Sequence, residues 1–221
     1  MSSELYDPIR TMSTITRQVI VSFSTGKESC VVMDLCARFF DRIVPFFMYP
    51  CQGLSFQEKS LRWYEKKYGV EVIRLPSFNM APMMRYGAFR EPDYDVPIIS
   101  VTDIYDYVRD KTGVYWVCGG ERIADSTIRR AMIKRTGSIA PKSGKFYPVA
   151  YWKKRDILEY MRVKKLYLGE DSRVFGASYH GWDGKTLSIL KERWPDDFEK
   201  IKRLYPLVEA VVKREAFYGG Q

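Results

Sequence analysis

The chain has 221 residues, of which 46% are hydrophobic and 15% aromatic, which is enough apolar surface for one sizeable core and too much for a disordered chain. No run of apolar residues approaches the roughly 18 that a membrane-spanning helix requires, so we expect no membrane association. The formal net charge of +9 predicts an anionic partner, whereas four scattered cysteines and one histidine, without a Cys-x-x-Cys pair, argue against a zinc site.

The first third of the chain alternates short apolar segments with amphipathic ones, after a lead-in, residues 1–16, that we expect to be mobile. The predicted elements are strands over 18–23, 43–48 and 70–75 and helices over 28–41 and 55–68. Ser55 and Glu58 have the spacing of a capping box at the start of the second helix. Near-continuous apolar strands joined by helices are typical of a parallel sheet that is covered on both faces.

The rest of the chain is less regular, beginning with a surface excursion over residues 76–97 that holds four prolines and three methionines. Further predicted elements are helices over 101–111, 123–136 and 153–163, strands over 114–118 and 146–150, and loops over 137–145 and 169–184. Pro195 and Pro206 break a helical C-terminal end, which we expect in two pieces. The sequence thus predicts an α/β fold with a mostly parallel, roughly five-stranded sheet, helices on both faces and a helical C-terminal portion.

One turn carries chemistry, because it follows the first buried strand directly and leads into the first helix. It reads Ser22-Phe23-Ser24-Thr25-Gly26-Lys27-Glu28-Ser29. At such a turn, free backbone N–H groups and the positive end of the helix dipole point at the occupant. Gly26 permits close backbone approach, the hydroxyl groups add donors, and Lys27 adds a mobile positive charge. The turn therefore suits a pyrophosphate, although it lacks the spacing of a Walker loop.

Three stretches resemble one superfamily. Residues 24–29, Ser-Thr-Gly-Lys-Glu-Ser, resemble the Ser-Gly-Gly-Lys-Asp-Ser PP-loop of the ATP pyrophosphatase and phosphoadenosine phosphosulfate (PAPS) reductase superfamily. Residues 119–126, Gly-Gly-Glu-Arg-Ile-Ala-Asp-Ser, followed by two arginines, are similar to the Gly-x-Arg segment of the PAPS reductase-like branch. Residues 147–160 resemble that branch's Asn-Pro-Leu-x-x-Trp-x-x-x-Asp-Val/Ile-x-x-Tyr signature. Together they extend over residues 18–165 in the order of the family.

The resemblance implies an adenine nucleotide α-hydrolase-like fold, with adenine near the end of the second strand and phosphates on the PP-loop. Residues 1–165 would form the PP-loop nucleotide-binding domain, and residues 166–221 a mainly helical extension packed on it. Lys27 would be catalytic, and ATP or a PAPS-like adenine nucleotide would bind with Mg²⁺, without an assigned metal-ligating side chain. The implied nucleotide-binding residues are Ser22, Ser24, Thr25, Gly26, Lys27, Glu28, Ser29, Gly119, Gly120, Arg122, Arg129 and Arg130.

Departures from the family pattern shape the functional prediction. Thr25 replaces a family glycine, Glu28 replaces an aspartate, and no cysteine follows Cys118, whereas PAPS reductases carry a C-terminal Glu-Cys-Gly-Leu/Ile-His with the attacking thiolate. We therefore predict an enzyme that cleaves ATP between the α and β phosphates to activate an unknown acceptor. One alternative is a PAPS reductase or sulfurtransferase-type activity with a borrowed thiol or Cys118. The other is a non-catalytic module that binds a nucleotide or nucleic acid.

The positive charge is concentrated in one segment. Residues 129–155 contain nine basic residues and no acidic one, while the other 27 Lys and Arg residues balance the 27 Asp and Glu residues. We interpret this segment as a rim of the nucleotide site. Its basic residues alternate with the aromatic residues Phe146, Tyr147, Tyr151 and Trp152, so a nucleic-acid groove remains an alternative, with core packing preferred for Tyr147 and Trp152. A homo-oligomer is a further open alternative.

Other candidate residues favour ordinary structural roles. Asp93, Asp95, Asp103 and Asp106 fit surface positions better than a metal site, and Cys118 fits a buried strand position better than a reactive thiol. His180 has no assigned role. The scattered cysteines are typical of a reduced compartment, and Glu4 and Asp7 stand where a secretory signal would need an apolar core, so we predict a cytoplasmic protein.

Overall fold

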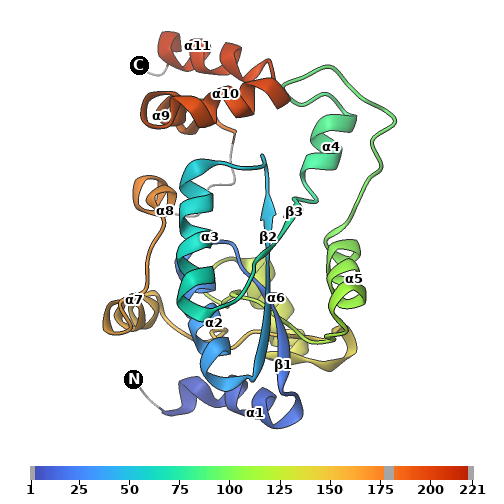
Figure 1. Ribbon diagram of the computed structural model, residues 1–221, viewed down its shortest axis with the longest axis vertical. Coiled ribbons are helices and arrows are strands. Elements are labelled where there is room, and N and C mark those ends of the chain that lie inside the picture. Colours follow the sequence, from blue (N-terminus) through green and yellow to red (C-terminus); the bar gives the residue numbers. More distant parts are fainter. Residues whose placement is uncertain (1–2, 177–181, 219–221) are drawn as a thin grey trace.

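The computed structural model describes residues 3–176 and 182–218 and contains a six-stranded sheet (Figure 1). Its strands are β1 (Gln18–Ser22), β2 (Arg42–Tyr49), β3 (Ile73–Pro76), β4 (Val117–Cys118), β5 (Ile139–Ala140) and β6 (Lys145–Phe146). In the order β3-β2-β1-β4-β6-β5, the first five strands are parallel, and β5 pairs antiparallel with β6. The predicted fold class is confirmed, with one more strand than expected.

Helices cover both faces of the sheet. Successive side chains of β1 point to opposite faces, and because they are apolar, each face must be buried against helices. The helices are α1 (Asp7–Ile15), α2 (Lys27–Phe39), α3 (Ser55–Tyr68), α4 (Met80–Arg85), α5 (Val101–Thr112), α6 (Thr127–Thr136), α7 (Lys154–Val163), α8 (Glu170–Phe175), α9 (Gly184–Arg193), α10 (Pro195–Leu204) and α11 (Val208–Tyr218). Val19 and Val21 belong to a core shared with α1, α2, α3 and α7. Ile20 packs on the other face, in a cluster with α5.

From Ser3 on, the N-terminal lead-in is helical, contrary to our expectation of a mobile segment. Residues 7–15 form α1, with Pro8 in its first turn, where a proline fits because the missing N–H would have no intrahelical partner. Ile9 and Met12 are fully buried against the core. A nine-residue segment without a long apolar period gave too little sequence signal, and tertiary packing of two side chains decided its structure.

Short helices and strands also occur in segments that we predicted to be irregular. The excursion over 76–97 contains α4, the loop over 137–145 contains β5 and the start of β6, and the segment 169–184 contains α8. The predicted strand over 146–150 is wrong beyond Phe146, since residues 148–151 form a turn. His180 lies outside the described residues, so its role stays open.

A buried carboxylate joins three helices beneath the sheet. Asp34 of α2 accepts hydrogen bonds from Tyr68 Oη at 2.6 Å, Tyr160 Oη at 2.7 Å and Arg38 Nε at 2.6 Å. Burial raises the pKa of Asp34, but the hydrogen bonds from Arg38, Tyr68 and Tyr160 outweigh it and hold the pKa below the ordinary value. Tyr68 ends α3 and Tyr160 lies in α7, so this carboxylate fixes the packing of both helices on α2.

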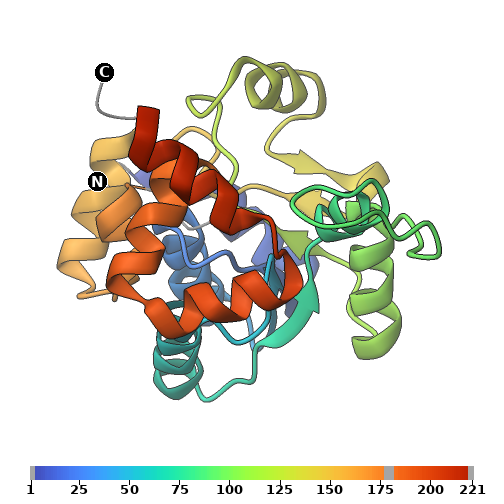
Figure 2. The same cartoon turned by 90° about the horizontal axis from the view of Figure 1, so that it is seen from above.

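The C-terminal end forms three helices rather than the expected two pieces, because Pro195 begins α10 and Pro206 precedes α11. Figure 1 shows α9, α10 and α11 stacked at the end of the molecule opposite α1, and Figure 2 shows them from above, with α6 on another side. Their apolar side chains form a separate cluster with Leu54 and Phe56 from the start of α3. Among the described residues, no helix is both long enough and apolar enough to span a membrane.

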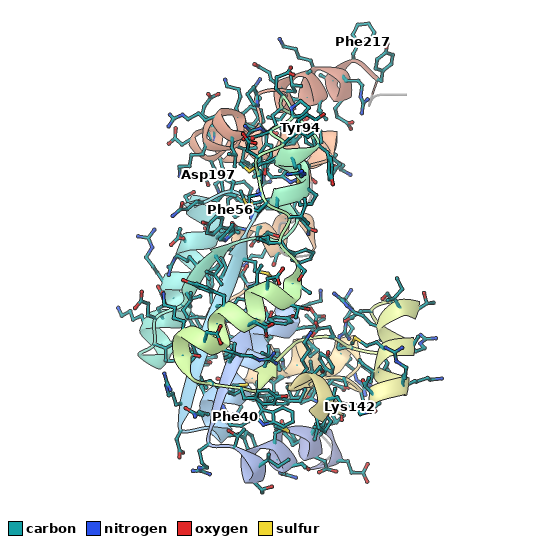
Figure 3. The ribbon with its side chains drawn as sticks, turned by 90° about the vertical axis from the view of Figure 1, so that its right-hand side faces the viewer. Phe40, Phe56, Tyr94, Lys142, Asp197 and Phe217 are labelled. Atoms are coloured by element: carbon teal, nitrogen blue, oxygen red, sulfur yellow. The ribbon has the colours of Figure 1, made fainter. Side chains whose placement is uncertain are left out.

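The predicted capping box at the start of α3 is wrong. Leu54 occupies the N-cap position, and Glu58 binds Arg74 instead of the helix terminus. The capping acceptor comes from α10: Asp197 Oδ2 accepts from the Ser55 backbone N–H at 2.7 Å and from Ser55 Oγ at 2.6 Å. Figure 3 shows Asp197 and Phe56 at this junction. A carboxylate distant in sequence therefore does what a local side chain was expected to do.

Replacing Asp197 by alanine is expected to destabilise the protein by about 2 kcal/mol, since the backbone N–H and hydroxyl of Ser55 and the ammonium of Lys200 lose a buried, charged acceptor. Urea denaturation at neutral pH measures the effect. The neighbouring, exposed Asp196 provides the matched control, for which Asp196→Ala should change the free energy of unfolding by less than about 0.5 kcal/mol. Equal effects of the two substitutions would contradict the capping role.

Candidate functional site

A cavity of about 760 Å³ lies at the carboxyl ends of the central parallel strands. Ligands in open α/β sheets bind at this edge, because the loops there converge. The lining residues come from the PP-loop, the ends of β2 and β4, the start of β6, and helices α5, α6 and α8. They are Ser22, Ser24, Gly26, Lys27, Glu28, Ser29, Met48, Phe78, Val101, Tyr105, Gly120, Glu121, Arg122, Asp125, Arg129, Met132, Lys145, Tyr147, Leu168, Ser172 and Gly176.

The PP-loop, residues 24–29, is held in shape by Ser29. Ser29 Oγ donates to the Gly26 carbonyl at 2.9 Å and accepts from the backbone N–H and the Oγ of Ser24, each at 3.2 Å. Gly26 is the N-cap of α2, and no side chain caps this helix. The N–H groups of its first turn are therefore left for a ligand in the adjoining cavity.

Thr25 shapes the loop from within. Its backbone has a φ of 61°, a left-handed conformation that costs a β-branched residue of the order of 1–3 kcal/mol. The side chain is buried, its Oγ1 has no hydrogen-bond partner, and the residue does not line the cavity. The family glycine would adopt this conformation without strain, so Thr25 keeps the loop geometry at an energetic cost and leaves the cavity uncrowded.

A buried arginine binds two acidic residues beside the loop. Arg122 Nη2 lies 2.9 Å from Glu28 Oε1 and 2.7 Å from Asp125 Oδ1, and the arginine side chain is only 7% exposed. Asp125 also pairs with Arg129 at 3.3 Å, and Glu28 lies 3.7 Å from Lys27 Nζ. The Nε of Arg122 is buried without a partner. We call these five residues the charge cluster. Its arginines and lysine suit a bound anion, because fork-shaped guanidinium groups and ammonium groups bind phosphate well.

The glycine pair after β4 has two different roles. A Cβ at Gly120 would lie 3.3 Å from both the Glu28 Cβ and the Ser29 backbone N, so only glycine lets this strand end approach the PP-loop without displacement. A Cβ at Gly119 would lie 2.1 Å from Glu121 Oε2. Gly119 therefore makes room for the Glu121 carboxylate and does not itself line the cavity.

Sequence reasoning missed Glu121 and placed Lys145 only as one of the nine basic residues of the predicted rim. Glu121 Oε2 is buried without a hydrogen-bond partner, and burial raises the pKa of this carboxyl, partly opposed by the charges of Arg129 and Lys145. Burial lowers the pKa of Lys145, whose Nζ lies 4.3 Å from the centroid of the Tyr105 ring. Glu121 occupies the variable position of the Gly-x-Arg stretch, which was the available signal. The sequence placed Lys145 at the end of the predicted loop over 137–145, and its partial burial depends on the pairing of β4 with β6.

The opposite end of the cavity is apolar. Met48 comes from the end of β2, Phe78 follows β3, and Val101 begins α5, beside the Tyr105 ring that packs edge-on against Phe46. Phe78 lies in the excursion over 76–97, which the sequence analysis treated as surface. The cavity thus has an apolar end near β2 and a polar end near β4 and β6, with Tyr105 in contact with Phe46 of β2 and Lys145 of β6.

Nine of the twelve predicted nucleotide-binding residues line the cavity. They are Ser22, Ser24, Gly26, Lys27, Glu28, Ser29, Gly120, Arg122 and Arg129. Thr25 and Gly119 support it from behind, and Arg130 does not reach it: this exposed residue of α6 donates from Nε to the Ile123 carbonyl at 3.3 Å. The nine converge from two distant segments because β1 and β4 are neighbours in the sheet.

The candidate thiol is poorly placed for chemistry. Cys118 is fully buried beside Cys36, and burial raises the pKa of its thiol well above the ordinary value. All four cysteines are buried and free, and none of them lines the cavity. Buried thiols with raised pKa values are weak nucleophiles, because the thiolate is the reactive form.

The candidate acidic residues form no metal cage. Among the described residues, no group of three or more His, Cys, Asp or Glu side chains could hold a metal ion. Asp103 bonds to the Ser100 backbone N–H in the capping box of α5, and Asp106 pairs with Arg109. Both therefore have structural roles at the surface.

The basic segment 129–155 divides into separate surfaces. Arg129 and Lys145 line the cavity, whereas Arg130, Lys134, Arg135 and Lys142 are exposed on or after α6 and Lys153, Lys154 and Arg155 are exposed at the start of α7. Only two of the nine basic residues therefore form the predicted rim of the cavity. Phe146, Tyr147 and Trp152 are buried, and Tyr151 alone of the four aromatic residues is exposed, so they form no stacking surface.

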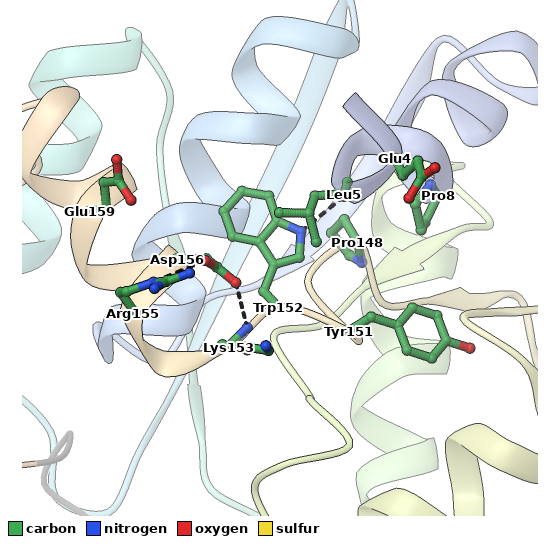
Figure 4. A pocket seen from close by; sticks show the side chains of 10 residues that line it. All are labelled: Glu4, Leu5, Pro8, Pro148, Tyr151, Trp152, Lys153, Arg155, Asp156 and Glu159. Carbon is green, nitrogen blue, oxygen red and sulfur yellow. Dashed lines mark hydrogen bonds and ion pairs between the residues drawn. The ribbon is translucent and has the colours of Figure 1, made fainter. Parts of the chain in front are cut away.

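A second cavity, of about 540 Å³, lies between the N-terminal helices and α7 (Figure 4). Its inner wall is Trp152, whose indole N–H donates to the Leu5 carbonyl at 2.9 Å. Lys153 and Arg155 lie at its edge with Asp156, which accepts from the Lys153 backbone N–H at 2.8 Å. The signature tryptophan and aspartate thus hold the start of α7 in place.

Three solved structures share this fold at low sequence identity. A U34-tRNA thiolase, NcsA, from Methanococcus maripaludis has a TM-score of 0.54 and 13% identity over 93% of this chain and 78% of its own. An NH3-dependent NAD synthetase from Campylobacter jejuni has a TM-score of 0.52 and 14% identity, over 98% of this chain and 93% of its own. A PAPS reductase from Candida auris, in a phosphate complex, has a TM-score of 0.51 and 13% identity, over 82% of this chain and 95% of its own. At these identities the similarity concerns the fold alone.

Family membership rests on sequence. No curated protein matches the chain. The model of the phosphoadenosine phosphosulfate reductase domain matches residues 18–169, which include β1, the PP-loop, the charge cluster and the whole signature around Trp152. The chain therefore belongs to the phosphoadenosine phosphosulfate reductase domain family, within the PP-loop superfamily of adenine nucleotide α-hydrolase-like folds.

Proposed function

We propose that the protein is an enzyme that binds ATP in the large cavity and cleaves it between the α and β phosphates to activate an acceptor. The observation that carries this proposal is the uncapped start of α2 at the PP-loop, with Lys27 and Arg122 beside it in the same cavity. Backbone N–H groups and two cations within reach of one turn match the charge and shape of a pyrophosphate. The volume of about 760 Å³ is in the range of small-ligand sites.

The two ends of the cavity give the nucleotide an orientation. The adenine would lie against Met48, Phe78 and Val101, and the β and γ phosphates on the PP-loop. Lys27 and the N–H groups of α2 would then stabilise the negative charge that develops on the departing pyrophosphate, and Arg122 would hold the phosphates from the other side. Such preorganised donors act on the transition state because the charge grows during cleavage.

Magnesium fits only as an ion carried by the nucleotide. The Glu28 carboxylate is engaged by Arg122 and Lys27, and Asp125 by two arginines, so the residues that the structure describes offer no complete set of oxygen ligands. Mg²⁺ commonly keeps one or two carboxylates together with substrate phosphates. Glu28 is the candidate protein ligand, and the bound ion would supply charge neutralisation at the phosphates.

ATP cleavage is favoured over sulfonucleotide reduction by one observation. Reduction requires a thiolate that attacks the substrate, and the four cysteines are buried away from the cavity. A PAPS-like nucleotide would fit the same loop, so it remains the alternative ligand. The exposed basic residues of α6 next to the cavity keep a nucleic-acid acceptor as a prediction, and the oligomeric state and cytoplasmic location also stay predictions.

Incubation with ATP and Mg²⁺ should release AMP and pyrophosphate, and Lys27→Ala should lower that rate about a hundredfold. Lys66→Ala, which removes an exposed lysine on α3, is the matched control and should leave the rate unchanged. Isothermal calorimetry with ATP separates binding from cleavage. The proposal is wrong if the wild-type protein neither binds ATP nor releases pyrophosphate from it, with or without added nucleophile, or if it releases sulfite from PAPS instead.

A further inference from the structure

The polar end of the cavity contains a carboxylate that none of the assigned roles uses. Glu121 lines the cavity directly after β4, and its Oε2 is buried without a hydrogen-bond partner. A buried carboxylate oxygen without a hydrogen-bond donor destabilises the folded protein, because it loses its hydration and gains no hydrogen bond in exchange. Such an oxygen in a native structure indicates a hydrogen-bond donor that comes from outside the protein chain.

The chain makes room for this carboxylate. The nearest atom to a Cβ built on Gly119 is Glu121 Oε2, at 2.1 Å, so any side chain at position 119 would push the carboxylate away. Gly119 has no positive φ, so its backbone does not require glycine. The glycine therefore serves the position of Glu121.

Charged residues surround Glu121, but none of those that the structure describes forms an ion pair with its carboxylate. Glu121 interacts electrostatically with Arg129, Lys145 and Asp125, yet among the described residues neither Glu121 nor Lys145 has an ion-pair partner. Lys145 lies over the Tyr105 ring at 4.3 Å instead. Tyr147, whose hydroxyl contacts Met132 Sδ, completes this end of the cavity. A ligand group placed between Glu121 and Lys145 would find one acceptor and one cation.

The position of the pair relative to Tyr105 defines its role. Tyr105 lies one turn of α5 after Val101, its ring packs edge-on against Phe46 of β2, and Lys145 Nζ lies over the same ring. Glu121 interacts electrostatically with both Tyr105 and Lys145. With adenine at the apolar end and the β and γ phosphates on the PP-loop, the pair beside Tyr105 would be next to the α phosphate, to which an acceptor must be joined.

We propose that Glu121 and Lys145 form the acceptor subsite, in which Glu121 binds and deprotonates a protic nucleophile, an O–H or N–H group, and Lys145 holds its negative charge. This inference rests on the proposed ATP cleavage. In the step, the acceptor oxygen or nitrogen forms a bond to the α-phosphorus, and the bond from that phosphorus to the bridging oxygen breaks. Pyrophosphate leaves with the electron pair, and the acceptor proton moves to the Glu121 carboxylate.

Hydroxylamine, a small nucleophile with both O–H and N–H groups, is the probe for this subsite. With ATP and Mg²⁺, Glu121→Gln should lower hydroxylamine-dependent pyrophosphate release about a hundredfold while ATP affinity, measured by calorimetry, stays unchanged. Glu192→Gln, at an exposed position of α9, is the matched control and should behave as the wild type. Equal rates for Glu121→Gln and the control, or a loss of ATP binding in Glu121→Gln, would overturn the assignment.

The pH profile separates a proton acceptor from a merely structural residue. The rate should rise with pH as Glu121 loses its proton, and this rise should be missing in Glu121→Gln. Gly119→Ala keeps the carboxylate but displaces it into the cavity, where water lowers its pKa, so the rise should move to lower pH. An unchanged profile in both variants would contradict the role.

A measurement without nucleotide distinguishes failure of this inference from failure of ATP cleavage. Carbon-13 NMR of carboxyl-labelled glutamate, assigned with Glu121→Gln, should show the Glu121 resonance moving when hydroxylamine is added to the full chain. If the wild type releases no pyrophosphate from ATP but this resonance moves, the subsite stands and ATP cleavage fails. A resonance that does not respond while the protein remains folded refutes the subsite.

Discussion

Arg122→Met is expected to destabilise the protein by about 3 kcal/mol and to abolish nucleotide binding. Arg122 is 7% exposed and lies within 2.9 Å of both Glu28 and Asp125, so its removal leaves two poorly solvated carboxylates without their main counter-charge. The same change removes the cation that we place on the phosphates. Urea denaturation measures the first effect, and calorimetry with ATP measures the second.

The chain offers a matched control for Arg122. Arg129 pairs with the same Asp125 but is 50% exposed, so solvent screens the interaction and Arg129→Met should cost less than about 1 kcal/mol. Neutralising the partners, with Glu28→Gln and Asp125→Asn added to Arg122→Met, should restore stability without restoring ATP binding. Similar losses for Arg122→Met and Arg129→Met would show that burial of the charge cluster is unimportant.

The second large effect is expected at Asp34, where Asp34→Asn should destabilise the protein by about 3 kcal/mol at neutral pH. The carboxylate is 1% exposed and accepts hydrogen bonds from Arg38, Tyr68 and Tyr160, which an amide cannot replace in full. The exposed Asp41, which pairs with Arg17, gives the control Asp41→Asn, with a loss of less than about 1 kcal/mol.

The pH dependence of this difference follows from the direction of the pKa shift. The folded-state pKa of Asp34 lies below its ordinary value of 3.8, so its stabilisation is fully present above that value and is lost as the pH falls through the lowered pKa. The gap between wild type and Asp34→Asn should therefore stay constant from neutral pH to about pH 5 and close in more acidic solution. Urea denaturation at each pH measures it, and a gap independent of pH would refute an ionised Asp34.

The net charge of +9 has a different meaning in the folded protein. In sequence it indicated one basic rim, whereas the fold places Arg129 and Lys145 in the cavity and the other seven basic residues of the segment on exposed surfaces of α6 and α7 and the loop between them. The cations that matter most for the proposed chemistry are Lys27 and Arg122, which lie outside that segment. Local charge density along the chain was therefore a poor guide to charge density around the cavity.

The core of the site was predictable because its signals are local. An apolar strand, a Ser/Gly turn and a helix are encoded by consecutive residues, so the PP-loop and Lys27 could be located without a fold. The Gly-x-Arg stretch placed Gly120 and Arg122 in the same site by resemblance, and the neighbouring positions of β1 and β4 bring them to the loop.

Other features depended on partners that no local pattern reveals. Ser55 and Glu58 have capping-box spacing, but Asp197 caps α3 and Glu58 binds Arg74. The left-handed backbone of Thr25 could not be anticipated from a β-branched residue.

The sequence by itself determined the α/β class, the parallel core and the phosphate-binding turn, since periodicity and turn chemistry act over a few residues. The tertiary structure alone decided that Glu121 and Lys145 meet at one end of the cavity and Met48 and Phe78 at the other. Strand order joins segments that are distant along the chain, and burial then sets their charge and reactivity. These are properties of the assembled fold, because desolvation and hydrogen bonding depend on neighbours in space.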